Sequence, residues 1–186
     1  MNEVEAVKSK NYLITIHTLL KRLWSQDFAD IWRLGVNVAL RISDLLSIRT
    51  ENIDLVRQEL EVVEGKTKKR RLIRLNDTAV KIIQRRQEVN YAHKYLFQSI
   101  GHRGRSLDKP MHRSTVARKF KEIGLIVGVK LGTHSMRKIR GYMLHKAVVS
   151  IEQIARVLNH SSPSVTMAYI GLTREATMQT YDDFDL

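Results

Sequence analysis

Along most of the chain, apolar residues recur every three or four positions, which is typical of amphipathic helices. The helices predicted in this way cover 11–24, 28–36, 77–88, 114–123 and 151–158. Two short apolar segments, 60–63 and 71–75, instead read as strands on either side of a turn at Gly65. The pattern therefore predicts a mixed α+β fold that is mainly helical, with a small antiparallel β-hairpin or sheet.

Several predicted helices have recognisable ends. Ser43 is predicted to cap a short helix, and Gly124 is predicted to end the helix that Ser114 begins. Ser150 opens a capping box, and Ser162 with the proline after it gives an N-cap followed by proline at the first helical position. Two short helices are therefore expected near the end of the chain, joined by a tight turn.

The charge of the chain indicates the kind of partner that it binds. The sequence has 32 Lys and Arg and 19 Asp and Glu, which gives a net charge of +13. Residues 171–186 carry one Arg and four acids, or −3, so the rest of the chain is +16. A body this basic favours a polyanion such as double-stranded DNA over a merely solvated surface. Cysteine is absent, which excludes disulfides and thiolate metal sites. No apolar run of membrane-spanning length and no signal-peptide pattern is present, so a cytoplasmic protein is expected.

Basic residues gather in three places. Six lie between Lys66 and Arg74 in the predicted hairpin, where phosphate contact is favoured over an ordinary solvated turn. The segment 99–112 is expected to be a flexible basic loop, and the helix from Ser114 carries cations outside its apolar face, either against DNA or simply in water. The candidate DNA-binding residues are Lys68, Lys69, Arg70, Arg103, Arg105, Arg118, Lys119 and Lys121.

Residues suited to phosphodiester chemistry cluster near the end of the chain. His134 and Arg137 are three apart, so on a helix they share a face. His160 follows the next predicted helix, and Tyr169 follows His160 by nine residues. Arginine can grip a phosphate, histidine can move a proton, and a phenol can attack phosphorus.

Arg41 lies far from this set, at a junction between two helices and among apolar residues. An unpaired charge there would be costly. Arg41 is therefore expected either to face a cleft or an anion, or to pair with Asp44 or another carboxylate, and the residues alone do not choose between these.

With these motifs in view, the chain resembles the catalytic domain of the tyrosine recombinases, the phage-integrase family. Residues 134–137 match the motif H-x-x-R, and 158–162 match a G-H-S-S-like step that precedes a tyrosine by nine residues. Residues 39–48 resemble G-L-R-x-S-E-L-x-x-L, with Asp44 at the acidic position. The chain departs from the family's usual glycine at Ala39 and Asn159. Asn tolerates the left-handed conformation that such a helix end often needs.

The resemblance implies a site-specific recombinase of a mobile element, which cleaves and rejoins DNA during recombination or integration. The catalytic residues that it implies are Arg41, Lys66, His134, Arg137, His160 and Tyr169. Tyr169 would form a 3′-phosphotyrosine and His134 would handle its proton, while Lys66 would protonate the leaving 5′ oxygen. Lys68 and Lys69 remain alternatives for Lys66. The arginines would hold the phosphate, with a hydrogen bond from His160. No metal or cofactor is implied, and the protein is expected to self-associate on DNA as a dimer or tetramer.

Two other functions remain open: a non-catalytic DNA-binding protein that uses 150–169 as a helix–turn–helix, and a type IB topoisomerase. The predicted domain covers residues 1–170, with 1–10 frayed, and leaves no room for the family's N-terminal DNA-clamping domain. Residues 171–186 form an acidic tail with apolar residues every three positions from Met178. The tail is expected to dock on its own domain or to exchange between protomers.

Overall fold

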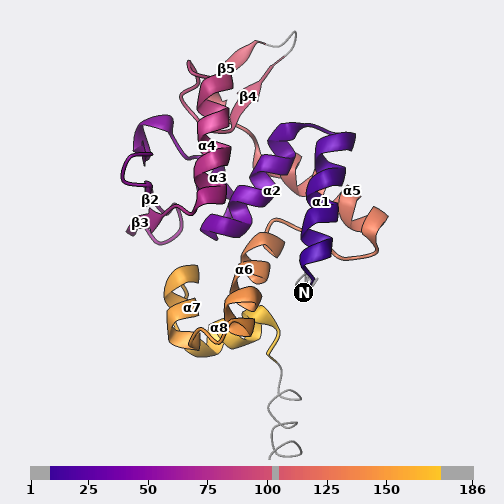
Figure 1. Cartoon of the computed structure of the whole chain (residues 1–186), viewed down its shortest axis with the longest axis vertical. Helices are drawn as coiled ribbons and strands as arrows, with labels where there is room; N and C mark the ends of the chain where they lie inside the picture. The colour runs from indigo at the N-terminus through magenta and orange to yellow at the C-terminus, as the bar shows by residue number, and fades with distance from the viewer. Residues whose placement is uncertain (1–8, 102–104, 173–186) are drawn as a thin grey trace, which may run out of the picture.

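The computed structural model describes residues 9–101 and 105–172 (Figure 1). The start of the chain, the candidate DNA contact Arg103 and the tail from residue 173 onward lie outside the described residues. The helices are α1 Lys10–Leu23, α2 Gln26–Val38, α3 Ile42–Leu46, α4 Asp77–Val89, α5 Arg113–Val127, α6 Ser135–Lys146, α7 Ile151–Leu158 and α8 Pro163–Ile170, with a 3-10 turn η1 Thr50–Asn52. The strands are β1 Ile53–Asp54, β2 Glu59–Val63, β3 Arg70–Arg74, β4 Gln98–Ile100 and β5 Ser106–Pro110. The predicted class, mainly helical with small antiparallel sheets, is confirmed.

The predicted hairpin is present and gains a third strand. Strands β1, β2 and β3 form an antiparallel sheet in that order, with Leu60 opposite Ile73. Leu60 and Val62 point inward and are buried, because side chains two apart on a strand share a face. The sheet therefore presents its turn, and the cations in it, at one edge of the molecule.

The prediction of a loop throughout 99–112 was wrong. Strands β4 and β5 pair across this segment, with Gln98 opposite Pro110 and an irregular register before Ile100. The buried Gln98 amide donates to the hydroxyl of Ser106 at 2.7 Å, which fastens the two strands. Strands this short and irregular leave no alternating pattern in the sequence.

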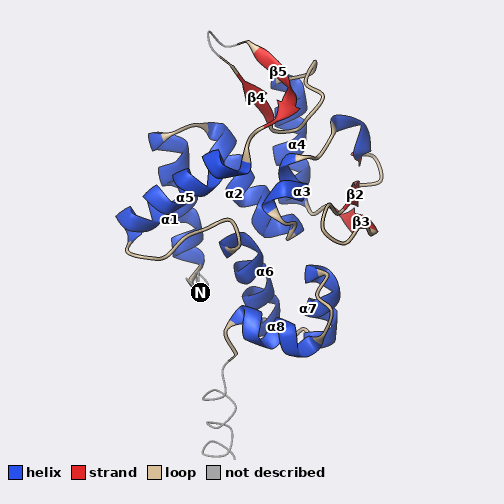
Figure 2. Cartoon of the chain, turned by 180° about the vertical axis from the view of Figure 1, so that it is seen from behind, coloured by secondary structure: helices blue, strands red, loops and turns tan. Residues whose placement is uncertain are grey.

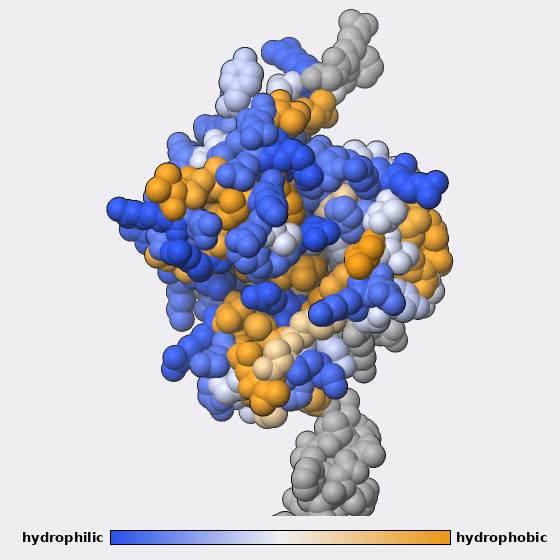
Figure 3. Space-filling view, viewed as in Figure 1, coloured by the Kyte–Doolittle hydropathy of each residue, from blue (hydrophilic) through white to orange (hydrophobic). Residues whose placement is uncertain are grey.

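Two hydrophobic clusters organise the helices. The larger lies among α1, α2, α4 and α5, where the rings of Trp32 and Phe120 meet edge to face at 5.3 Å. The smaller contains Ile154, Leu158 and Ile170, together with Ala39 from the end of α2. Helix α6 packs against α2 and leads from the body to α7 and α8 (Figures 1 and 2). Hydrophilic side chains cover most of the face seen in Figure 3, with apolar patches between them. None of the described helices is long and apolar enough to cross a membrane.

Two predicted helix ends are confirmed, and two are wrong. The hydroxyls of Ser150 and Ser162 cap α7 and α8 as expected. Ser43, however, lies inside α3, whose N-cap is Arg41. Gly124 also lies inside its helix, because α5 runs on to Val127 and ends at a left-handed Gly128 with φ of 70°.

Gly124 is needed for a close approach rather than for a turn. A Cβ there would lie 2.6 Å from the carbonyl oxygen of Val129 and 2.9 Å from the nitrogen of Leu131. The chain that leaves α5 folds directly back over this position, which only glycine accommodates.

Replacing Gly124 by alanine should therefore destabilise the fold, even though alanine favours a helix. Overpacking against backbone outweighs the helix-propensity gain, so the free energy of unfolding should fall by about 1–3 kcal/mol. Gly128→Asn, at an open position where Asn tolerates a positive φ, should change it much less. Urea denaturation of both variants measures the difference. A Gly124→Ala protein as stable as the parent would contradict the close-approach explanation.

Candidate active site

Arg41 sits at the junction where α2 ends and α3 begins. Ala39 ends α2 in the left-handed region, with φ of 54°, at a position where the resembling family usually has glycine. The Arg41 side chain is 20% exposed, and its Nη1 donates to Oε2 of Glu64 at 2.5 Å. The carboxylate partner considered for Arg41 is therefore real, but it is Glu64 rather than Asp44. Partial exposure still leaves the guanidinium able to meet an anion.

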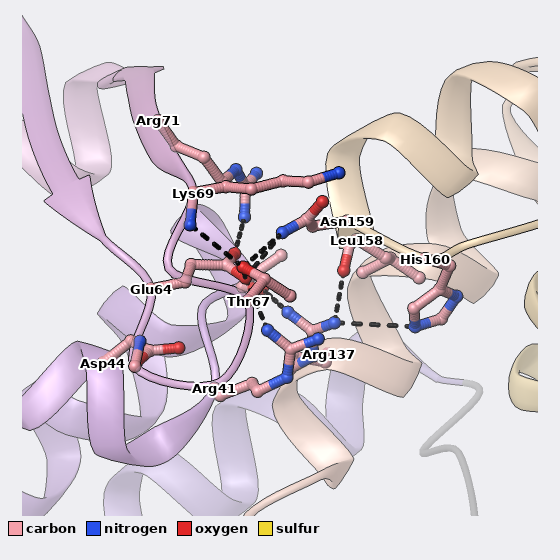
Figure 4. Close-up of polar contacts among 12 residues, drawn as sticks. Arg41, Asp44, Glu64, Thr67, Lys69, Arg71, Arg137, Leu158, Asn159 and His160 are labelled. Atoms are coloured by element: carbon pink, nitrogen blue, oxygen red, sulfur yellow. Dashed lines mark hydrogen bonds and ion pairs between the residues drawn. The ribbon is translucent and has the colours of Figure 1, made fainter.

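Glu64 is the centre of the polar network (Figure 4). Its side chain is completely buried, and besides Arg41 it accepts from Arg71 Nη1 at 2.6 Å, Asn159 Nδ2 at 2.6 Å and the Thr67 hydroxyl at 3.1 Å. Burial alone would raise the pKa of Glu64, but the hydrogen bonds from Arg71, Asn159 and Arg41 outweigh it and lower the pKa to about 2. The carboxylate is therefore ionised throughout the range in which proteins work.

Arg137, on α6, is also buried, with 2% of its surface exposed. Its guanidinium donates to the carbonyl oxygens of Ala39, at the end of α2, and of Leu158, at the end of α7. Carbonyls at helix ends lack partners inside the helix, and they attract cations. The same Nη2 approaches Nε2 of His160 at 3.5 Å. Arg137 thus joins the body, α7 and the turn that carries His160.

The hydrogen bonds of His160 define its neutral form. Arginine can only donate, so Nε2 of His160 accepts from Arg137, and Nδ1 carries the proton and donates to the Thr166 hydroxyl at 3.0 Å. Thr166 in turn donates to the carbonyl of Ser162 at 3.3 Å. Burial and the nearby charges of Arg137 and Arg41 lower the pKa of His160 to about 4. At neutral pH, His160 therefore orients Arg137 as an acceptor.

Tyr169 and His134 meet across the site. The Tyr169 hydroxyl lies 3.1 Å from Nδ1 of His134, and the Tyr169 ring stands edge-on to His160 with centroids 4.7 Å apart. Burial raises the pKa of Tyr169 although Arg137 opposes the shift, so the phenol is protonated at neutral pH. Burial and Arg137 lower the pKa of His134, so its ring is neutral there. A neutral imidazole beside a protonated phenol is the arrangement needed for removing the phenol's proton.

Lys66 is exposed in the turn between β2 and β3. The backbone N–H of Gly65, next to it, donates to Oδ1 of the buried Asp44 at 2.9 Å, which anchors the turn on α3. The charge of Lys66 is close enough to help lower the pKa of His134. The structure thus brings Lys66 to the same site as Arg41, His134, Arg137, His160 and Tyr169.

The candidate DNA-binding cations are distributed unevenly around this site. Lys68 and Lys69 are exposed in the same turn as Lys66 and share its edge of the molecule, while Arg70 pairs with Glu61 on the sheet. Arg105 is exposed immediately before β5. Arg103 is not among the described residues.

The cations of α5 lie elsewhere. This helix packs against α1, on the side of the molecule away from the β2–β3 turn (Figures 1 and 2). Arg118 and Lys121 are exposed there. Lys119 is partly buried, with Nζ 3.0 Å from the Trp24 ring centroid and 3.2 Å from Oε2 of Glu122. The charge of Lys119 therefore already has partners within the protein, and its contact with DNA stays a prediction.

Sequence reasoning missed Glu64, Arg71 and the side chain of Asn159. A signal for Glu64 was present: it continues the inward series of Leu60 and Val62 at a spacing of two. A carboxylate at a position that the pattern predicts to be buried requires cationic or hydrogen-bonding partners. The partners themselves lie as far as 95 residues away, so the pattern could not name them.

Comparison with known proteins agrees with this geometry. Residues 11–175 match the model of the phage integrase family. The chain is 31% identical over 185 residues to a probable integrase/recombinase, YoeC, of Bacillus subtilis (strain 168), which covers 99% of this chain and 98% of that protein. Of several other curated relatives, the chain spans about half the length or less.

Solved structures show the same fold. The XerA recombinase superposes with a TM-score of 0.74 at 18% identity over 98% of this chain and 65% of that one. The Tn1549 transposon integrase, solved in complex with a circular intermediate DNA, gives a TM-score of 0.75 at 15% identity over 99% and 67% of the two chains.

The low pKa of Glu64 predicts an acid-sensitive contribution to stability. The folded-state pKa of about 2 lies below the ordinary 4.5, so this contribution is complete above pH 4.5 and is lost as the pH falls toward 2. The shift corresponds to about 3 kcal/mol in the free energy of unfolding. Urea denaturation of the parent and of Glu64→Gln between pH 6 and pH 2.5 should show a difference in stability that shrinks with acidification. Parallel profiles for the two proteins would contradict the assignment.

Proposed function

The chain belongs to the phage integrase family, which makes it a tyrosine recombinase, and we propose that it cleaves and rejoins double-stranded DNA at specific sites through a 3′-phosphotyrosine at Tyr169. The observation that carries the proposal is the contact of the Tyr169 hydroxyl with Nδ1 of His134 at 3.1 Å, beside Arg137. In this proposal, Tyr169 is the nucleophile, the neutral His134 is the base, and Arg137 is part of the cationic phosphate site.

Each proposed catalytic group has a defined task. The Tyr169 oxygen bonds to the scissile phosphorus as its proton passes to His134, and the bond to the 5′ oxygen breaks. Lys66 donates a proton to that departing oxygen. Rejoining is the reverse: a 5′ hydroxyl attacks the phosphotyrosine and Tyr169 leaves. The covalent intermediate keeps the bond energy, so no nucleotide cofactor is needed.

Two arginines provide the charge that the pentacoordinate state requires. Arg41 and Arg137 would bind the non-bridging oxygens, where negative charge grows as Tyr169 attacks. A phosphate bound here raises the pKa of His160, and the protonated ring can then donate Nε2–H to the phosphate instead of accepting from Arg137. Positioning and charge stabilisation account for most of the catalysis expected in phosphoryl transfer.

The proposed partner is DNA, followed by other copies of the protein. The net charge of +13 and the likeness to the Tn1549 integrase, whose structure includes DNA, support binding of double-stranded DNA. A cytoplasmic location is part of the proposal. Exchange of strands requires a second duplex, so assembly into a dimer or tetramer on DNA is proposed, with the tail after residue 170 exchanged between protomers.

The two alternatives differ in how much of the site they explain. A helix–turn–helix binder would use α7 and α8 to read DNA, but α8 turns Tyr169 toward His134 and His160. A type IB topoisomerase would share the chemistry without exchanging partners. A substrate with two recombination sites separates the topoisomerase from the recombinase, because only the recombinase yields exchanged products.

Tyr169→Phe should bind DNA normally and form no covalent adduct, because only the attacking oxygen is removed. Suicide substrates that trap protein on nicked DNA, followed by denaturing electrophoresis, measure the adduct. Tyr142→Phe serves as the matched control and should form the adduct like the parent. An adduct that persists in Tyr169→Phe would refute the proposed function.

Lys66→Ala should be at least about 100-fold slower than the parent on normal DNA, in line with the usual contribution of a general acid. The defect should largely disappear when sulfur replaces the bridging 5′ oxygen, because a thiolate leaves without being protonated. Cleavage rates on the two substrates provide the comparison. Rescue seen for Lys68→Ala or Lys69→Ala in place of Lys66→Ala would move the assignment within the turn.

A further inference from the structure

The proposed catalytic residues come from separate parts of the chain, and one buried side chain connects three of those parts. Glu64 contacts Arg41 at the α2–α3 junction, Thr67 in the turn that carries Lys66, and Asn159 in the turn that carries His160. Resting on the proposed function, we propose that Glu64 is a positioning residue for DNA cleavage, which holds Arg41 in its phosphate-binding orientation and, with Asn159, fastens the Lys66 turn to the His160 turn.

Burial argues that Glu64 acts through its neighbours rather than on DNA. Its side chain has no exposed surface, and both oxygens are engaged: Oε2 by Arg41, Thr67 and Asn159, and Oε1 by Arg71. One negative charge faces two arginines, so the cluster keeps an excess positive charge for a phosphate. A carboxylate beside the phosphate would repel it, and complete burial behind the arginines avoids this.

The contact with Arg41 leaves most of that guanidinium available. Among the described residues, Glu64 engages only Nη1 of Arg41, and the side chain remains 20% exposed. A guanidinium fixed at one nitrogen cannot swing freely, because its planar fork must turn as a unit. Glu64 therefore selects one orientation of Arg41 before DNA arrives, which lowers the entropy lost on binding the transition state.

Asn159 provides the connection between Glu64 and the turn that carries His160. This residue ends α7 with φ of 49°, a conformation that glycine adopts more easily. In return, its Nδ2 donates to Glu64 at 2.6 Å, a bond that glycine cannot make. Arg71 reinforces the same connection, because its Nη1 binds Glu64 while its Nη2 donates to the carbonyl of Val157 at 3.0 Å. The end of α7, and with it His160, is thereby tied to the hairpin.

The test compares two DNA substrates that differ in the negative charge of the scissile phosphate, which Arg41 is proposed to stabilise. A methylphosphonate at the scissile position replaces one non-bridging oxygen by a methyl group and removes the negative charge. Arg41→Ala should then be strongly impaired on normal DNA and much less so on the methylphosphonate.

If Glu64 acts through Arg41, Glu64→Gln should bind DNA like the parent, cleave normal DNA about 10- to 100-fold more slowly, and recover on the methylphosphonate as Arg41→Ala does. The double variant should be no slower than Arg41→Ala alone. A matched control is Glu59→Gln, at the start of the strand that leads into Glu64 but paired with Arg74, and it should cleave both substrates normally.

A merely structural role predicts a different result: Glu64→Gln would lose the same factor on both substrates, and the defects of the double variant would multiply. Either outcome overturns the proposal. Asn159→Gly provides a second test if Glu64→Gln folds poorly, since it removes one donor and keeps both ion pairs. The Asn159→Gly substitution should slow cleavage several-fold in the parent and not at all in Glu64→Ala. Equal slowing in both proteins would refute the proposal that Asn159 acts through Glu64. If the parent enzyme cleaves DNA in these assays but Glu64→Gln does not behave as expected, the proposed function is retained and only the role of Glu64 is refuted.

Discussion

A buried carboxylate is stable only when donors replace the water it has lost, and this constraint at Glu64 governs the site. Removing an ionised group from water costs several kcal/mol unless charge and hydrogen bonds compensate. Arg41, Arg71, Asn159 and Thr67 supply that compensation from four places in the chain. The carboxylate thereby connects the α2–α3 junction, the hairpin and the end of α7.

Arg137 is a buried cation, so it needs hydrogen-bond acceptors just as the buried carboxylate of Glu64 needs donors. Its buried guanidinium needs acceptors, and it finds them in the carbonyls of Ala39 and Leu158 at the ends of two helices. Both helices stop in the left-handed conformation, at Ala39 and Asn159, which turns the chain sharply and leaves the carbonyls open to a partner. The residue that would hold the phosphate therefore also connects the end of α2 with the end of α7.

Without a bound anion, the site has an excess of positive charge, a neutral His134 and a protonated Tyr169. Burial and the charges of Arg137 and Arg41 lower the pKa of His134 and keep its ring neutral, while burial raises the pKa of Tyr169 and keeps its phenol protonated. A phosphodiester entering among these cations supplies the missing negative charge. Its charge would also offset that of the arginines at His160 and raise the pKa of that ring, which could then donate a hydrogen bond to the phosphate, whereas His134 is already neutral without DNA.

The sequence by itself determined the helical class, the hairpin, the caps at Ser150 and Ser162, and the motifs that include Arg41, His134, Arg137, His160 and Tyr169. These depend on spacings of two, three, four and nine residues, which short stretches of chain express directly. The predicted helix end at Gly124 was wrong, because glycine is required there by a loop that folds back over the helix. The predicted loop at 99–112 was also wrong, because its strands are too short to show a pattern. Sequence reasoning also passed over Glu64, because burial can be inferred from alternation but partners cannot. Only the tertiary structure decided which donors would meet that carboxylate, since they are brought together by packing between elements as far as 95 residues apart.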